Sequence, residues 1–288
     1  MVFSQASHIV LVGIFLGLSL FALLRTRIRL PAPVRIYLPY LWLFFLAFTL
    51  ADLLTVKIWI WAFAALSFLA LREYFTLVDL RIQDRWGILA AYLAIPFMFY
   101  YLRSDWYGMF IISVPVWAFL AVPFAVALGG KAEGAVFSVG VIELGLFLLV
   151  YCIGHVAYLT FYSTWMAIFL VSGVAICDLL AFVLKSRDRP PLQACLHQVL
   201  LPAPVIALLG FALVPWSGIP VAHSVILGLL IPALVAVGSF TMDCLEVDLG
   251  IDRSRLSPGR GAVLNSMKSY LYTAPVVFHY LRYFLDAF

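Results

Sequence analysis

The stretch VFSVGVIELGLFLLVYCIGHVAYL, residues 136–159, decides the fold. It is almost entirely apolar, and its acidic and basic side chains are confined to Glu143 and His155. The hydrocarbon core of a bilayer is about 30 Å thick, and a helix of about 20 residues crosses it. The stretch therefore predicts a transmembrane helix over 135–158.

Similar apolar runs fill most of the 288-residue chain. Hydrophobic residues make up 65% of it and charged residues 11%, whereas a soluble domain carries roughly a quarter charged residues. The runs predict spans over 7–24, 36–56, 58–71, 88–102, 109–128, 135–158, 164–184, 193–214, 221–242 and 266–285. We therefore expect an all-α integral membrane protein, a polytopic bundle of about ten transmembrane helices that forms one domain over 1–288.

Length and proline content add detail to these spans. The third and fourth are short for a crossing, which predicts tilted or partly re-entrant segments. Prolines inside several spans predict kinks rather than breaks, because neighbouring helices can satisfy the freed carbonyls; they are Pro39, Pro96, Pro115, Pro123, Pro204 and Pro232. The first run lacks a preceding basic region and a following small-residue cleavage site, so we interpret it as a retained span.

The basic residues predict an orientation. With ten spans, five loops face one side and hold Arg25, Arg27, Arg29, Arg35, Arg72, Arg81, Arg85, Lys131, Lys185, Arg187, Arg189, Arg253, Arg255 and Arg260. The loops of the other side hold little beyond Lys57 and Arg103. The positive-inside rule places the five basic loops in the cytoplasm and both termini outside it. The net charge of +4 reflects these loops, and we expect no nucleic-acid partner.

Asp178 is the strongest candidate for chemistry among the acids within spans. It lies about one and a half turns inside the basic end of its span, and Lys185, Arg187 and Arg189 follow it. A carboxylate beside clustered cations suits Mg²⁺ and a phosphate, because Mg²⁺ takes hard oxygen ligands and shares them with substrate phosphates. The alternative is a single buried aspartate paired with a lysine or arginine.

The polar stretch LEVDLGIDRSRLSPGRGAVLNSMKS, residues 245–269, supplies further candidates. Asp243 and Glu246 share a helix face at i, i+3 spacing and could hold a divalent ion; an ordinary solvated helix end is the alternative. Asp248 and Asp252 add acids nearby, and the cations that could hold phosphates here are Arg253, Arg255 and Arg260.

Four other ionisable residues lie at or near membrane depth. Glu143 and His155 share one span but are too far apart along it to touch directly, and each is either functional or a buried hydrogen-bonded group. Asp52, close to Lys57, and His197, after a basic loop, are more typical of interfacial positions.

The C-terminal quarter, VGSFTMDCLEVDLGIDRSRLSPGRGAVLNSMKSYLYTAPVVFHYLRYF (237–284), resembles the phosphatidate cytidylyltransferase family, the CDP-diacylglycerol synthases. The elements in common are Gly238, Asp248-Leu249-Gly250-Ile251, Ser254, Leu256, Pro258-Gly259, Gly261, Leu264, Ser269 and TAPVVF. A weaker likeness, in DRWGILAAYLAIP, VYCIGHVAYL and CDLLAF, extends it over residues 60–288. The spans of residues 1–60 precede this cytidylyltransferase-like region.

The resemblance implies a site and also shows where the chain departs from the family pattern. Asp178 and Asp248 stand in register with family acids, so the resemblance implies that they are catalytic. Family aspartates are replaced by Ser239, Asn265 and Lys268, and a family histidine by Arg260. A lysine near a divalent ion would repel it by several kcal/mol at about 4 Å and an effective dielectric near 20. The expected metal ligands are then Asp178, Asp243 and Glu246.

Two functions follow. The first is a divergent cytidylyltransferase that uses Mg²⁺ to join CTP to a phosphatidate-like membrane lipid, releasing pyrophosphate. The second is a catalytically inactive relative that binds lipid as the partner or regulator of another membrane lipid enzyme, or as a homodimer. In either case we expect a bacterial inner-membrane protein with its site loops in the cytoplasm. A transporter has little support, because no inverted repeat of spans is visible.

Overall fold

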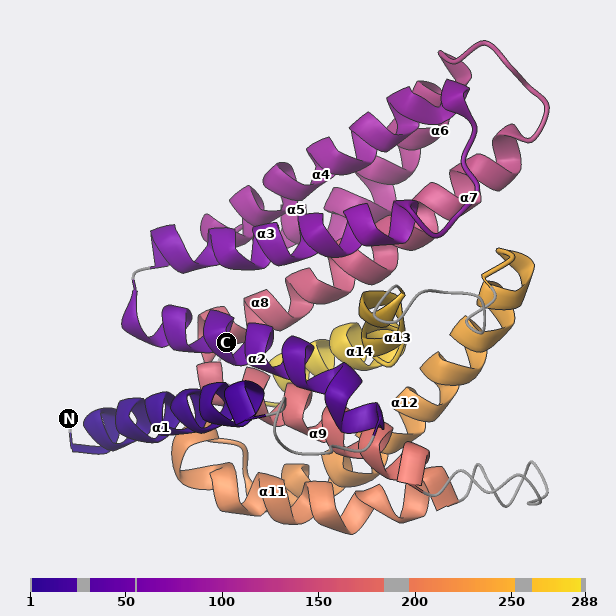
Figure 1. Cartoon of the computed structure of the whole chain (residues 1–288). Coiled ribbons are helices and arrows are strands. Elements are labelled where there is room, and N and C mark those ends of the chain that lie inside the picture. Colours follow the sequence, from indigo (N-terminus) through magenta and orange to yellow (C-terminus); the bar gives the residue numbers. More distant parts are fainter. Residues whose placement is uncertain (1, 25–31, 55, 184–196, 252–260, 286–288) are drawn as a thin grey trace.

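The computed structural model describes residues 2–24, 32–54, 56–183, 197–251 and 261–285, and every regular element within them is a helix (Figure 1). The first elements are α1 (Val2–Leu24), α2 (Ala32–Leu53), α3 (Val56–Phe75), η1 (Ile82–Asp84), α4 (Arg85–Arg103), α5 (Tyr107–Ile112), η2 (Ser113–Ala118) and α6 (Phe119–Ala127). They are followed by α7 (Ala135–Leu146), η3 (Phe147–Tyr151), α8 (Cys152–Tyr162), α9 (Thr164–Val183), α11 (Pro202–Ser217), α12 (Val221–Asp248), α13 (Ala262–Met267) and α14 (Tyr270–Phe284).

The helical membrane-type fold is confirmed. Within the described ranges, seven helical segments are long and apolar enough to cross a membrane: Ile58–Phe75, Ile82–Arg103, Tyr107–Ala127, Ala135–Tyr162, Thr164–Ala181, His197–Ser217 and Val221–Asp248. α1 and α2 supply the shorter apolar segments His8–Leu23 and Leu41–Ala51, and α14 has 15 residues. Within the described residues each predicted span thus falls mainly on helix, and the count of ten is approximate.

The prediction that the third and fourth spans are short is wrong. α3 has 20 residues, and the segment Ile82–Arg103 has 22. Arg72 lies in the last turn of α3 and Arg85 begins α4. Long basic side chains at helix ends can reach the membrane interface, so they extend a spanning helix rather than end it.

Prolines affect the spans in different ways. Helices continue through Pro39, Pro96, Pro123 and Pro232, and Pro115 lies in the π-helical turn η2. The predicted kink at Pro204 is wrong, because this residue lies in the first turn of α11, after a break at Leu201. A proline is tolerated there, since the N–H it lacks would have no helical partner.

The helices form two groups that meet along α8, α9 and α14 (Figure 1). In one group α3, α4, α6, α7 and α8 pack against one another; in the other, α9 packs against α2, α11 and α12. α14 contacts α8 of the first group and α9 and α12 of the second. The predicted last span, 266–285, is divided, because α13 ends at Met267 and α14 begins at Tyr270. Lys268 and Ser269 form this junction.

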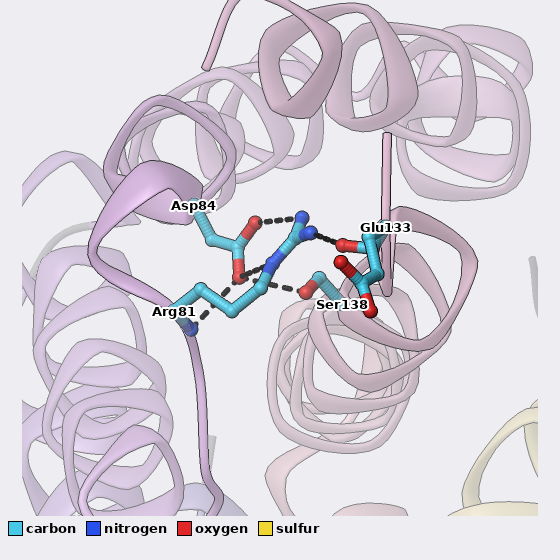
Figure 2. Close-up of polar contacts among 4 residues, drawn as sticks. All are labelled: Arg81, Asp84, Glu133 and Ser138. Carbon is cyan, nitrogen blue, oxygen red and sulfur yellow. Dashed lines mark hydrogen bonds and ion pairs between the residues drawn. The ribbon is translucent and has the colours of Figure 1, made fainter. Parts of the chain in front are cut away.

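A buried carboxylate fixes the start of α4 to the start of α7 (Figure 2). The Asp84 side chain is 0% exposed and accepts hydrogen bonds from Arg81 through its backbone N–H (2.9 Å), Nε (3.1 Å) and Nη2 (2.7 Å). The Ser138 hydroxyl donates to the same carboxylate at 2.7 Å. Arg81 also donates to the carbonyl oxygen of Glu133, and its bonds to Asp84 raise its pKa. This cluster stabilises the fold at the predicted cytoplasmic face.

Candidate functional site

Asp178 lies at the centre of a polar cluster contributed by α9, α12 and the α13–α14 junction. Its residue is 8% exposed, and the hydroxyl of the fully buried Ser269 donates to its Oδ1 at 2.6 Å. Burying a carboxylate is costly unless it is hydrogen-bonded. The break between α13 and α14 puts Ser269 at the N-cap of α14, where it reaches α9.

Ser239 of α12 extends this cluster. Its hydroxyl oxygen is 3.4 Å from that of Ser269. The neighbouring Gly238 lets α12 approach the α13–α14 junction closely, because a Cβ at this position would lie only 3.1 Å from the carbonyl oxygen of Lys268. Ser239, where the resemblance implies an aspartate, therefore lies in the same cluster as Asp178.

Lys268 forms an ion pair with Asp243 at the edge of this cluster. Its Nζ is 2.8 Å from Asp243 Oδ1, and the exposed fractions of the two side chains are 14% and 62%. Lys268 stands where the resemblance implies an aspartate, and Asp243 was a candidate metal ligand. The Lys268 ammonium group thus binds one oxygen of the Asp243 carboxylate, in the place of a bound metal ion.

The remaining predicted residues have different surroundings. Glu246 is buried on α12, 4% exposed, whereas Asp248 is exposed at the last residue of the same helix. Asn265 lies partly buried on α13. The predicted phosphate contacts lie outside the described residues; they are Lys185, Arg187, Arg253, Arg255 and Arg260.

The residues around Asp178 fit a two-ion centre poorly. Within the described part of the chain, no group of three or more histidine, cysteine, aspartate or glutamate residues could hold a metal ion. The cluster combines the Asp178 carboxylate, two serine hydroxyls and the Lys268 ammonium. Serine can offer Mg²⁺ a neutral oxygen, but it lacks the negative charge that strengthens binding, and the ammonium repels a divalent ion.

The sequence interpretation missed two partners. The resemblance includes Ser269 among the shared residues, but it does not indicate that Ser269 donates a hydrogen bond to Asp178. The Asp84 cluster was also missed: the spacing of Arg81 and Asp84 signals a local ion pair, but nothing in the sequence links them to Ser138, 54 residues away.

Glu143 and His155 lie in different surroundings on their shared span. His155 is fully buried on α8, with Nδ1 2.8 Å from the carbonyl oxygen of Tyr151 and its ring edge-on to Phe110 at 5.0 Å. Glu143 lies on α7, where it lines a pocket with Pro115 and Phe119. For Asp52, near the end of α2, the structure describes the backbone alone.

Comparison with known proteins gives a partial likeness. An Escherichia coli K12 protein, "Uncharacterized protein YnbB", is 27% identical over 242 residues, covering 77% of this chain and 78% of its own. A "Phosphatidate cytidylyltransferase" of a Synechocystis species is 37% identical over 57 residues, covering 19% of this chain and 20% of that enzyme. No protein-family model matches the chain, and no solved structure matches it significantly. The chain is thus a helical membrane-type protein with a partial match to a phosphatidate cytidylyltransferase.

Proposed function

We propose that this protein acts in phospholipid metabolism as a phosphatidate-cytidylyltransferase-like protein that binds a phosphatidate-like lipid without transferring a cytidylyl group. It would then serve as a partner or regulator of another membrane lipid enzyme. The observation that supports this most is the Lys268–Asp243 ion pair beside Asp178. A tethered cation neutralises an acid there, so the cluster has less need of a divalent ion and less capacity to hold one.

The lipid phosphate would be held by cations rather than by metal. Lys185 and Arg187 follow the end of α9, and Arg253, Arg255 and Arg260 follow the end of α12. Asp178 lies in the last two turns of α9 and Asp243 in those of α12, so these arginines and lysines are the expected contacts of the lipid phosphate. Guanidinium groups bind phosphate oxygens in a bidentate geometry.

A divergent cytidylyltransferase is the second candidate. The buried Asp178–Ser269 pair favours it, because both residues match family positions and meet at 2.6 Å. Mg²⁺ would supply charge neutralisation for the triphosphate when bound. The residues that would hold Mg²⁺ are Asp178, Ser239, Ser269, Asp243 and Glu246.

The deciding experiment incubates purified protein with CTP, Mg²⁺ and phosphatidate in nanodiscs and measures CDP-lipid. We expect no product above an Asp178→Ala control, no Mg²⁺-dependent CTP binding by calorimetry, and tighter association with phosphatidate than with phosphatidylcholine. Product formation above the control establishes the second candidate instead. Equal association with both lipids removes the proposed lipid specificity.

A charge-restoring variant tests the role of Lys268 directly. Ser239→Asp combined with Lys268→Asp places two carboxylates beside Asp178, so Mg²⁺ should stabilise this variant against heat. Saturation about 100-fold above Kd corresponds to roughly 2.7 kcal/mol. Ser239→Asn combined with Lys268→Met is the matched neutral control and should not respond. Mg²⁺ stabilisation of the natural protein to the same extent contradicts the proposal.

We also propose that the protein lies in a bacterial inner membrane with the basic loops in the cytoplasm. The support is the positive-inside pattern and the bacterial source of both relatives. Membrane-impermeant thiol labelling of single cysteines introduced at Lys131 and Arg103 checks this orientation in intact cells. We expect labelling of the cysteine at position 103 alone. Labelling of the cysteine at position 131 alone would show the opposite orientation.

A further inference from the structure

A pocket at membrane depth holds one acidic group. It has a volume of about 350 Å³ and lies between the α5–η2–α6 segment and α7–η3. Its lining includes Val114, Pro115, Phe119, Glu143, Leu144 and Phe147. The Glu143 carboxyl group is the only ionisable group among the residues that line it.

The pocket is accessible from the hydrocarbon layer. Glu143 lies eight residues after Ala135, the start of the spanning segment Ala135–Tyr162, which corresponds to about 12 Å along the helix axis. The rim residues Phe119 and Phe147 are 54% and 36% exposed. Side chains exposed along a spanning segment face lipid, so a membrane lipid can enter this pocket without leaving the bilayer.

Glu143 lacks a partner for one of its oxygens. Its Oε1 is buried and has no hydrogen-bond partner among the described residues. An unsatisfied polar group in hydrocarbon is costly, and an ionisable residue there is a functional candidate by default. The helices on both sides of the pocket form π-helical turns at this level, η2 with Pro115 and η3 beginning at Phe147. Such turns are frequent at functional sites.

We propose that this pocket binds a neutral lipid alcohol, a membrane lipid with acyl chains and one free hydroxyl group. The hydroxyl group pairs with the Glu143 carboxyl group, which lines the pocket, and the acyl chains pack against the apolar walls. A hydroxyl group can pair with a carboxyl group in either protonation state and brings no second charge into the membrane. The pocket shares no residue with the Asp178 cluster, so this inference does not depend on the proposed function.

The experiment compares two lipids that differ only at the hydroxyl group. Full-length protein in nanodiscs receives 1,2-dioleoylglycerol or its 3-acetyl ester, and native mass spectrometry measures bound lipid and oligomeric state. We expect the natural protein to prefer the free alcohol by about three- to tenfold, the range of one hydrogen bond within a membrane protein. Glu143→Leu should lose this preference, whereas Glu143→Gln should keep most of it, because its amide oxygen still accepts.

Glu133→Gln is the matched control, since Glu133 is exposed in the α6–α7 loop outside the pocket, and it should bind like the natural protein. Equal binding of both lipids by the natural protein overturns the proposal, as does a preference that persists in Glu143→Leu. A dimer that dissociates in Glu143→Leu, with no preference between the lipids, shows that a second copy of the chain covers the pocket and also overturns it.

Discussion

Asp84 and Asp178 are both buried carboxylates near helix ends, but their hydrogen bonding differs. Asp84 accepts three hydrogen bonds from Arg81 and one from Ser138, which matches the roughly four acceptor positions of a carboxylate. Asp178 accepts one, from Ser269, among the described residues. The nearby cation Lys268 instead contacts Asp243. Asp84 thus has its acceptor positions filled and acts in the fold, whereas the described residues give Asp178 a single donor.

The largest effect is expected at Asp84. Asp84→Ala removes the partner of Arg81 and should lower the free energy of unfolding by about 2 kcal/mol. This is below the range of roughly 3–5 kcal/mol for breaking a fully buried pair, because the Arg81 side chain is 24% exposed. Denaturant unfolding in detergent micelles, followed by tryptophan fluorescence, measures the change.

Glu133→Gln is the control that tests whether the loss is specific to the Arg81–Asp84 ion pair. Arg81 bonds to the backbone carbonyl oxygen of Glu133, so changing the side chain leaves that bond in place. We expect its unfolding free energy to stay within about 0.5 kcal/mol of the natural protein. An equal loss in both variants would show that the loss is not specific to the Arg81–Asp84 pair.

A smaller effect is expected in the Asp178 cluster. Ser269→Ala leaves a buried carboxylate without its hydroxyl donor and should cost about 1–2 kcal/mol of unfolding free energy. Ser239→Ala should cost less than about 0.5 kcal/mol, because Ser239 lies 3.4 Å from Ser269 and does not contact Asp178 directly. A larger loss in Ser239→Ala would place Ser239 as the main partner in the cluster.

The sequence predicted the spans well because apolar runs of membrane length are a local signal. Where it failed, the missing information was three-dimensional. Arg72 and Arg85 appeared to end their spans, but long basic side chains at helix ends extend a helix to the interface. The resemblance brought Ser239, Lys268 and Asp178 into one predicted site. It could not predict that Lys268 pairs with Asp243, because this depends on the break between α13 and α14.

The smallest effect concerns how closely α12 approaches that break. Gly238→Ala puts a Cβ 3.1 Å from the Lys268 carbonyl oxygen and 3.6 Å from Tyr272 Cδ2, and this crowding opposes the gain of up to about 1 kcal/mol that alanine brings to a helix. Gly140→Ala on α7 is the matched control, because nothing lies within 4 Å of its Cβ. Unfolding experiments should therefore show Gly140→Ala stabilised by up to about 1 kcal/mol and Gly238→Ala unchanged or slightly destabilised. Equal gains in the two variants would mean that α12 has room at Gly238. In that case α12 does not hold the junction that carries Lys268 and Ser269. The Ser269 hydroxyl, the one donor to Asp178 among the described residues, would then be less firmly positioned than the donors to Asp84.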